Sequence, residues 1–177
     1  MTRKRRKTSA TNTKNRTRVA LGLGANIGEA RAALCAAARI LGGVLQDARF
    51  ASLYRSRPRS AIAQPDFFNT AVVGMTTLAP LELLRLGKNL EALAGRRPGP
   101  VDGPRPLDVD LLLFGEDMIE SDGLVVPHPR LRERRFVLAP LAELEPAWAV
   151  PPDGATVQAL LAGVGQENDV QRVGDVC

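Results

Sequence analysis

The stretch Gly103-Pro-Arg-Pro-Leu-Asp-Val-Asp-Leu-Leu-Leu-Phe114 leads from a proline-rich loop into a strand of apolar residues. Side chains alternate across a strand, so Asp108 and Asp110 share one face while Val109 points to the other. Two carboxylates on one face repel each other unless a cation neutralises them. Oxygen ligands of this kind suit Mg²⁺, which proteins usually hold with one or two carboxylates plus substrate phosphates. The alternative, a pair of solvated acids, is disfavoured because acids that enter a core need a partner.

This strand is the last of a series. Apolar runs, leucine spacing and the placement of Gly and Pro predict strands at 18–24, 44–54, 69–76 and 107–114, a helix at 28–41 that stops at Gly42-Gly43, and a helix from Pro80 that ends at Gly95. The order β-α-β-β-α-β is that of a ferredoxin-like α+β fold, with helices on one face of a sheet. Additional C-terminal helices, expected around 136–145 and 156–162, would pack on the other face or at an edge.

The positive charge is concentrated at the N-terminus. The net charge is +5, but residues 1–18 hold eight of the 24 basic residues and no acid. The remainder has 16 bases against 19 acids, a net charge of −3. We therefore predict a basic, disordered tail at 1–17, a single domain at 18–177, and no specific nucleic-acid partner. The alternative is a ferredoxin-like nucleic-acid-binding module; such a module exposes aromatic residues on its strands, and the predicted strand interiors carry no such pair.

The composition also indicates the cellular location of the protein and the state of its two cysteines. No stretch is long and apolar enough for a membrane span or a secretory signal, so we expect a cytoplasmic protein without a membrane partner. Cys35 and Cys177 are the only cysteines. Cys35 lies in an alanine-rich helical pattern and is expected to pack as a small apolar side chain. Neither a disulfide framework nor a zinc site is predicted.

Five separated motifs, in this order along the chain, match one family. They are Gly24-Ala-Asn26, Tyr54-Arg-Ser56, Gln64-Pro-Asp-Phe-Phe-Asn69, Gly103-Pro-Arg-Pro-Leu-Asp-Val-Asp110 and Pro127-His-Pro-Arg-Leu-Arg-Glu-Arg-Arg-Phe136. The chain resembles 6-hydroxymethyl-7,8-dihydropterin pyrophosphokinase over about residues 18–160. That family transfers pyrophosphate from ATP to the hydroxymethyl group of the pterin and releases AMP, in folate biosynthesis. The resemblance implies ATP as cosubstrate, two Mg²⁺ ions, and a neighbouring enzyme of folate synthesis as a candidate partner.

The resemblance also implies roles for individual residues. The metal ligands would be Asp108 and Asp110, and the catalytic groups would be these two with Arg97 and Arg105. The acceptor site would consist of Ser56, Phe67, Asn69 and Phe136, in which two rings sandwich the pterin and the amide reads its edge. The nucleotide would be bound by Glu91, Arg105, His128 and Arg134. Core packing is the alternative for the two rings, and a solvated helix face is the alternative for Glu91.

His128 is the only histidine of the chain. A lone histidine is more often structural than catalytic, but this one follows Pro127 and has three arginines close by in sequence. We expect it to contact the nucleotide. An obligatory general base is not proposed, because phosphoryl transfer relies mainly on alignment and charge neutralisation.

The loop before the Asp-x-Asp motif departs from the family pattern. Val101-Asp102 stand where a basic residue and an aromatic are common, and the segment from Gly95 is one residue shorter. Arg96 and Arg97 therefore both qualify for the family's loop arginine. Asp102 adds an acid near the expected triphosphate, so a catalytically weakened relative is a further alternative.

A second departure lies in the loop beside the expected pterin site. Arg57 and Arg59 replace residues that are usually apolar or small, and we expect them to face solvent.

Overall fold

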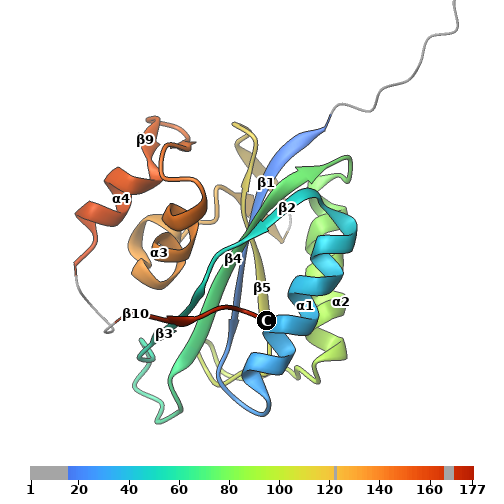
Figure 1. Ribbon diagram of the computed structural model, residues 1–177, viewed down its shortest axis with the longest axis vertical. Coiled ribbons are helices and arrows are strands. Elements are labelled where there is room, and N and C mark those ends of the chain that lie inside the picture. Colours follow the sequence, from blue (N-terminus) through green and yellow to red (C-terminus); the bar gives the residue numbers. More distant parts are fainter. Residues whose placement is uncertain (1–15, 122, 166–169) are drawn as a thin grey trace, which may run out of the picture.

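The central sheet is built in the order that the sequence predicts. The computed structural model describes residues 16–121, 123–165 and 170–177. Its core elements are β1 (Thr17–Ala25), α1 (Ala30–Val44), β2 (Gln46–Phe50), β3 (Leu53–Ser56), β4 (Phe67–Thr76), α2 (Pro80–Leu93) and β5 (Asp108–Phe114). β1 lies between β4 and β5, β2 and β3 both pair with β4, and all of these pairs are antiparallel. The α+β class and the ferredoxin-like core are thus confirmed (Figure 1).

The C-terminal part adds smaller elements. They are β6 (Ile119–Ser121), β7 (Leu124–Val126), a 3-10 turn (Leu131–Glu133), α3 (Arg135–Leu144), β8 (Ala149–Val150), β9 (Ala155–Thr156), α4 (Val157–Gly163) and β10 (Gln171–Gly174). The two predicted C-terminal helices correspond to α3 and α4. β10 is not predicted from the sequence; it pairs with β3 and forms one edge of the sheet.

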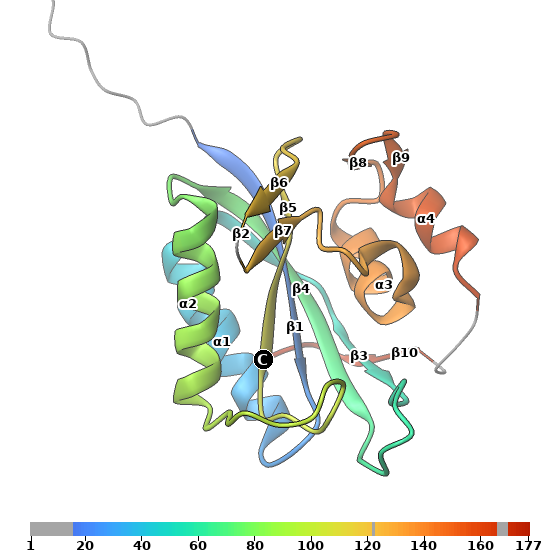
Figure 2. The same ribbon diagram turned by 180° about the vertical axis from the view of Figure 1, so that it is seen from behind.

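Helices cover both faces of the sheet (Figures 1 and 2). α1 and α2 lie on one face, where Leu34 and Leu83 are buried in the first hydrophobic core. α3 and α4 lie on the other face, where Leu138 and Trp148 belong to a second core. Because both faces are covered, β4 is buried continuously from 69 to 74. The site described below lies at one end of this sheet.

The strand predicted at 44–54 is divided in two. β2 ends at Phe50 and β3 begins at Leu53, although both pair with β4. The division has a physical cause in Glu143 of α3, whose carboxylate accepts hydrogen bonds from the Ser52 backbone N–H at 3.1 Å and the Ser52 hydroxyl at 2.7 Å. The Tyr54 hydroxyl donates to the same carboxylate at 2.8 Å. The contact that interrupts the strand also attaches α3 to the sheet.

The predicted end of the first helix is wrong. α1 continues through Gly42-Gly43 to Val44. A Cβ on Gly42 would lie 3.2 Å from the ring of Phe50, so the glycine allows β2 to approach the helix closely and does not terminate it.

The prediction for Cys35 is also wrong. Cys35 and Cys177 form a disulfide across 142 residues, with their Cα atoms 5.1 Å apart. The segment that follows β10 runs back to α1 and brings Cys177 to Cys35, which no local pattern around either cysteine indicates (Figure 1).

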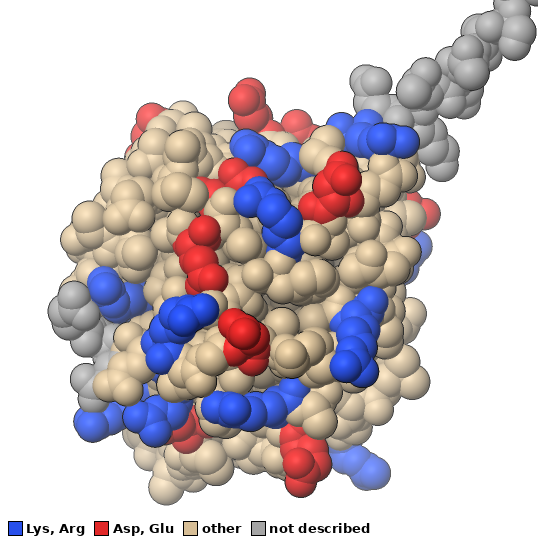
Figure 3. All heavy atoms as spheres, viewed as in Figure 1, with Lys and Arg blue, Asp and Glu red and all other residues tan. Residues whose placement is uncertain are grey.

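The predicted tail, 1–17, lies outside the described residues except for its last two positions, and Thr17 already belongs to β1. Within the described ranges, no helix has the length and apolar character needed to cross a bilayer. The face shown in Figure 3 carries basic and acidic side chains interspersed with one another.

Candidate active site

Three loops meet at one end of the sheet, and Asn26 joins them. Its side chain is only 5% exposed. The amide nitrogen donates to Gln64 Oε1 at 2.9 Å and to the Pro65 carbonyl at 3.0 Å. The amide oxygen accepts from the Arg105 N–H at 2.8 Å, while the Asn26 N–H donates to the Arg105 carbonyl at 3.0 Å. The loops after β1, before β4 and before β5 therefore form one connected rim.

β5 begins at this rim and carries the two carboxylates. Asp108 and Asp110 line a hollow on the face of the sheet that α3 covers. Val109 points to the opposite face and is buried in the core under α1 and α2. The alternation that the sequence predicts is thus confirmed. The residues opposite them on β1 are Gly24 and Gly22, which leave the adjoining surface without side chains.

The two carboxylates differ in their surroundings. Asp108 accepts from Arg105 Nη1 at 2.7 Å, and its other oxygen contacts Arg96. Burial alone would raise the pKa of Asp108, but the charges of Arg105 and Arg96 hold that pKa below its usual range. Burial and repulsion by Asp108 raise the pKa of Asp110 to about 6. The arginines that contact Asp108 outweigh its burial, whereas the charges of Lys88 and Arg134 near Asp110 do not outweigh its burial and the repulsion by Asp108.

His128 does not place a positive charge beside Asp110 at pH 7. Its Nε2 lies 3.8 Å from Asp110 Oδ2. Burial, with the nearby charge of Arg134, lowers the pKa of His128 to about 4, so the imidazole is neutral at pH 7. The proximity of His128 and Asp110 is therefore not an ion pair at that pH.

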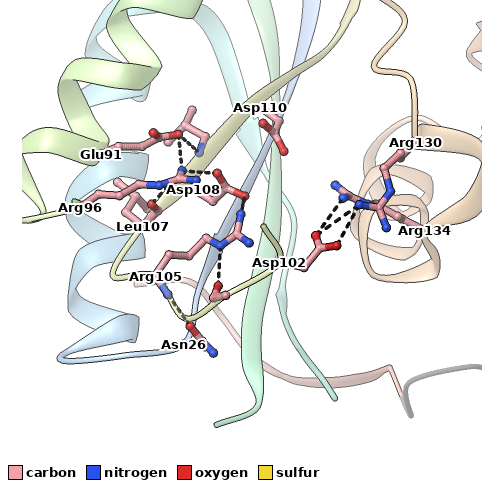
Figure 4. A network of polar contacts seen from close by, with 12 residues as sticks. Asn26, Glu91, Arg96, Asp102, Arg105, Leu107, Asp108, Asp110, Arg130 and Arg134 are labelled. Carbon is pink, nitrogen blue, oxygen red and sulfur yellow. Dashed lines mark hydrogen bonds and ion pairs between the residues drawn. The ribbon is translucent and has the colours of Figure 1, made fainter. Parts of the chain in front are cut away.

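Glu91 supports β5 from beneath the carboxylates (Figure 4). It is 4% exposed, and its Oε1 accepts from the Val109 N–H at 2.9 Å and from Lys88 Nζ at 2.8 Å. The same oxygen lies 2.9 Å from Arg96 Nη1, so Glu91 also orients the arginine that contacts Asp108. Glu91 is thus buried in a polar network, and its solvated alternative is wrong. Its contact with nucleotide stays a prediction.

A pocket opens between β3, β4 and α3, beside the carboxylates. Asn69 is 5% exposed and donates to Ser56 Oγ at 2.9 Å. Phe67 from β4 and Phe136 from α3 line the same pocket, together with Asp108. The four predicted acceptor residues are thus brought together next to a predicted metal ligand. The rings are only partly buried, which distinguishes them from core side chains.

Comparison with known proteins places this arrangement in a family. Residues 20–146 match the model of 7,8-dihydro-6-hydroxymethylpterin-pyrophosphokinase (HPPK). The chain belongs to the HPPK family. The 2-amino-4-hydroxy-6-hydroxymethyldihydropteridine pyrophosphokinase of Bacillus subtilis is 41% identical to this HPPK chain over 126 residues, which cover 70% of the chain and 75% of that protein.

Other similar proteins are longer. The mitochondrial folate synthesis bifunctional protein of Arabidopsis thaliana is 45% identical over 128 residues, 71% of this chain but 23% of its own length. Wild-type HPPK-DHPS of Plasmodium falciparum, solved with STZ-DHP, shares the fold with a TM-score of 0.68 at 16% identity, over 88% of this chain and 44% of that one. The HPPK chain thus spans about a quarter of the plant relative and under half of the Plasmodium chain.

The predicted nucleotide residues of this HPPK chain lie in different places. Arg105 and Arg134 line the pocket with Asp108, and His128 lies beside Asp110. Arg97 instead lines a separate hollow with Lys88, Glu91 and Arg96. Of the two loop arginines, Arg96 is the one that contacts Asp108. A catalytic role for Arg97 stays a prediction and has no support from a contact with either carboxylate.

Arg57 and Arg59 do not simply face solvent. Both are exposed, yet both line the acceptor pocket, and Arg59 Nη1 donates to the Glu133 carbonyl at 2.8 Å. The sequence does not predict these positions, because they depend on tertiary contacts between the loop of Arg57 and Arg59 and the turn before α3.

Asp102 forms a second cluster of a carboxylate and arginines (Figure 4), and its members line the acceptor pocket. Arg130 Nη1 lies 3.2 Å from each of its two carboxylate oxygens, and Arg134 Nη2 lies 3.7 Å from one of them. The Nε of Arg134 is buried without a hydrogen-bond partner among the described residues. Sequence reasoning gave Arg130 no role, although it stands inside a quoted motif beside His128.

Proposed function

We propose that this chain transfers the pyrophosphoryl group of ATP to the hydroxymethyl group of 6-hydroxymethyl-7,8-dihydropterin and releases AMP, in folate biosynthesis. The hydroxyl oxygen of the acceptor attacks the β-phosphorus, the bond from that phosphorus to the α-phosphate oxygen breaks, and the hydroxyl proton is lost. One observation carries the proposal: the predicted acceptor pocket and the Asp-x-Asp pair adjoin each other in a member of the HPPK family.

The acceptor would lie between Phe67 and Phe136. Stacking between two rings positions a flat heterocycle and excludes water from its faces. Asn69 offers both a donor and an acceptor to the pterin edge, and its hydrogen bond to Ser56 holds the amide in place. These residues would present the hydroxymethyl group toward Asp108.

The donor set at β5 fits Mg²⁺. Among the described residues, no group of three or more His, Cys, Asp or Glu side chains could hold a metal ion. Two carboxylates without a third protein ligand suit a cation that keeps water and phosphate oxygens in its shell. Burial and repulsion by Asp108 raise the pKa of Asp110 even though the charges of Lys88 and Arg134 lower it, so a cation bound beside Asp110 would relieve this repulsion. When bound, Mg²⁺ neutralises charge on the phosphate oxygens. Asp108 and Asp110 would hold it.

Arginines would orient the triphosphate. Arg105 and Arg134 both line the pocket, and a guanidinium presents donors in a fork that matches phosphate oxygens. Arg96 reaches Asp108 from the other side and would hold that carboxylate in position. Because phosphoryl transfer depends on alignment and charge neutralisation, these roles suffice without a general base.

The alternatives have less support. A nucleic-acid-binding sheet presents aromatic residues on an open face, whereas helices cover both faces of this sheet. A weakened relative would lack part of the site. Both carboxylates and all four acceptor residues are nevertheless brought together, and the substitution at Asp102 alone favours this reading.

The test is AMP release in a coupled assay with ATP, Mg²⁺ and the dihydropterin. Release should require all three, and Asp110→Asn should abolish most of it. Asp117→Asn is the matched control, an exposed aspartate just beyond the other end of β5 that should leave the rate unchanged. ATP consumption that does not depend on the pterin would contradict the proposal.

Location and partners follow from the same proposal. The cytoplasm stays our prediction, although the Arabidopsis relative is named mitochondrial. Relatives named bifunctional suggest that another enzyme of folate synthesis lies close to this one in the cell.

A further inference from the structure

Asp102 occupies a place that is built for an anion. Its carboxylate contacts both Arg130 and Arg134, and all three residues line the pocket. The side chain of Arg134 is 13% exposed, so its charge is largely removed from water. Two guanidinium groups in such a position repel each other unless an anion joins them, and burial together with the charge of Arg130 lowers the pKa of Arg134.

A phosphate group would satisfy the same two arginines. A carboxylate and a phosphate both offer paired oxygens to a guanidinium fork, with similar geometry. Arg134 retains an unpartnered, buried Nε, so Asp102 uses only part of its donor capacity. A phosphate, with more oxygens than a carboxylate, could use the rest.

The segment that carries Asp102 is attached mainly at its two ends. At one end Arg96 contacts Asp108, and at the other Arg105 is bonded to Asn26. Between these anchors the residues from 97 to 101 are exposed, and Val101 is 86% exposed. Besides its carboxylate, Asp102 has a hydrogen bond from Gln64 Nε2 to its carbonyl at 2.9 Å. The contact with the arginines is thus a substantial part of what holds Asp102 at the pocket.

We propose that Asp102 is a resident anion that competes with the polyphosphate of the substrate for Arg130 and Arg134. Its carboxylate occupies the two guanidinium groups at the pocket until a polyphosphate displaces it. The identity of that polyphosphate as the triphosphate of ATP rests on the proposed function; the competition itself does not. Because a binding-competent state that is only partly populated lowers the apparent affinity, removing the internal anion should tighten polyphosphate binding.

The test uses Asp102→Asn, which keeps the size of the side chain and removes its charge. Asparagine also tolerates the left-handed backbone of this position, where φ is +54°. The dissociation constants of tripolyphosphate and of a nonhydrolysable ATP analogue, measured by calorimetry without pterin, should each fall about 5- to 30-fold. Asp47→Asn is the matched control, because Asp47 has φ +51° and is exposed on β2, away from the site. It should change neither constant by more than about twofold.

A second measurement separates competition from simple repulsion between Asp102 and phosphate. If Asp102 acts by occupying the arginines, the gain from Asp102→Asn should shrink in an Arg130→Gln background. A gain of the same size in both backgrounds, or no gain in the wild-type background, would overturn the proposal.

AMP release by the wild-type chain is measured in parallel. Absence of release together with tighter tripolyphosphate binding by Asp102→Asn would remove the proposed function and leave the resident anion. Release without tighter binding would do the reverse.

Discussion

Two carboxylates of the candidate site each contact a pair of arginines, and they differ in the element that carries them. Asp108 stands at the start of β5, between Arg96 and Arg105, where ladder pairing with β1 fixes its backbone. Asp102 stands on a turn of the preceding loop, between Arg130 and Arg134. The side chain of Asp108 is 21% exposed and that of Asp102 is 36% exposed.

Under the two proposals above, the same charge pattern serves opposite purposes. A carboxylate on a strand cannot leave its arginines, so they become a fixed frame around a group that is available to a cation. A carboxylate on a loop can be withdrawn, so its arginines become available to another anion. The element that carries the charge, more than the charge itself, decides which of these applies.

The largest effect expected from this comparison is on turnover. Asp108→Asn keeps the shape of the side chain and one carbonyl oxygen but removes the charge that would hold Mg²⁺. We expect AMP release at saturating substrates to fall at least about 100-fold, on the order of 3 kcal/mol in the barrier. Circular dichroism should show an unchanged fold. A rate within about threefold of wild type would end the assignment of Asp108 as a metal ligand.

The contribution of Phe67 and Phe136 to pterin binding should not depend on the clusters around Asp108 and Asp102. Phe67→Ala and Phe136→Ala should each weaken pterin binding by about 1–3 kcal/mol, the scale of losing a stacked ring. Titration with pterin in the presence of a nonhydrolysable ATP analogue measures this effect. The analogue alone should bind as it does to wild type, and Phe136→Leu should lose less because it keeps apolar volume. Equal weakening of pterin and analogue would mean that the rings act through the fold.

The free energy of unfolding should respond differently to the loss of Asp108, which contacts two arginines, and to the loss of Asp110 on the same strand. Asp108→Ala removes the carboxylate partner of the partly buried Arg105 and leaves Arg96 with Glu91 as its carboxylate partner, so the free energy of unfolding should fall by about 1–2 kcal/mol. Asp110→Ala relieves repulsion and should leave that energy level or raise it. Urea unfolding at pH 7 in the presence of EDTA measures both. A loss of equal size in the two variants would show that Asp110 has a compensating partner after all.

Much of the site could be predicted because its determinants are local. The shared face of Asp108 and Asp110 follows from strand periodicity alone. The acceptor residues Ser56, Phe67 and Asn69 are predicted from the family resemblance, and they lie in short motifs on two strands that pair in the structure.

What could not be predicted depends on contacts between distant segments. The break after Phe50 requires Glu143, which lies about ninety residues further along the chain. The pairing of Cys35 with Cys177 requires β10, whose short sequence carries little periodic signal. That Arg96, and not Arg97, contacts Asp108 depends on the buried Glu91, whose carboxylate pairs with Arg96 and holds it next to Asp108.

Asp110 provides the baseline for the comparison, because its burial and the repulsion by Asp108 outweigh the charges of Lys88 and Arg134. Its pKa is raised to about 6 in the folded protein, above the usual value of about 3.9 in an unfolded chain. Between these values the folded state binds more protons, so this group makes the protein less stable as pH rises from about 4 to about 6. Asp108 has the opposite sign, since its lowered pKa gives stability that is lost only as pH falls below about 4.

Asp110→Asn should therefore be no more stable than wild type near pH 4.5 and about 1 kcal/mol more stable at pH 7, a value discounted because the side chain is 30% exposed. Unfolding in urea at the two pH values, with EDTA, gives the difference. Adding Mg²⁺ at pH 7 should stabilise wild type and reduce the advantage of the variant, because the cation compensates the charge that the variant lacks. A difference that stays constant with pH would mean that Asp110 is compensated in the folded state, and the contrast between it and Asp108 would then be lost.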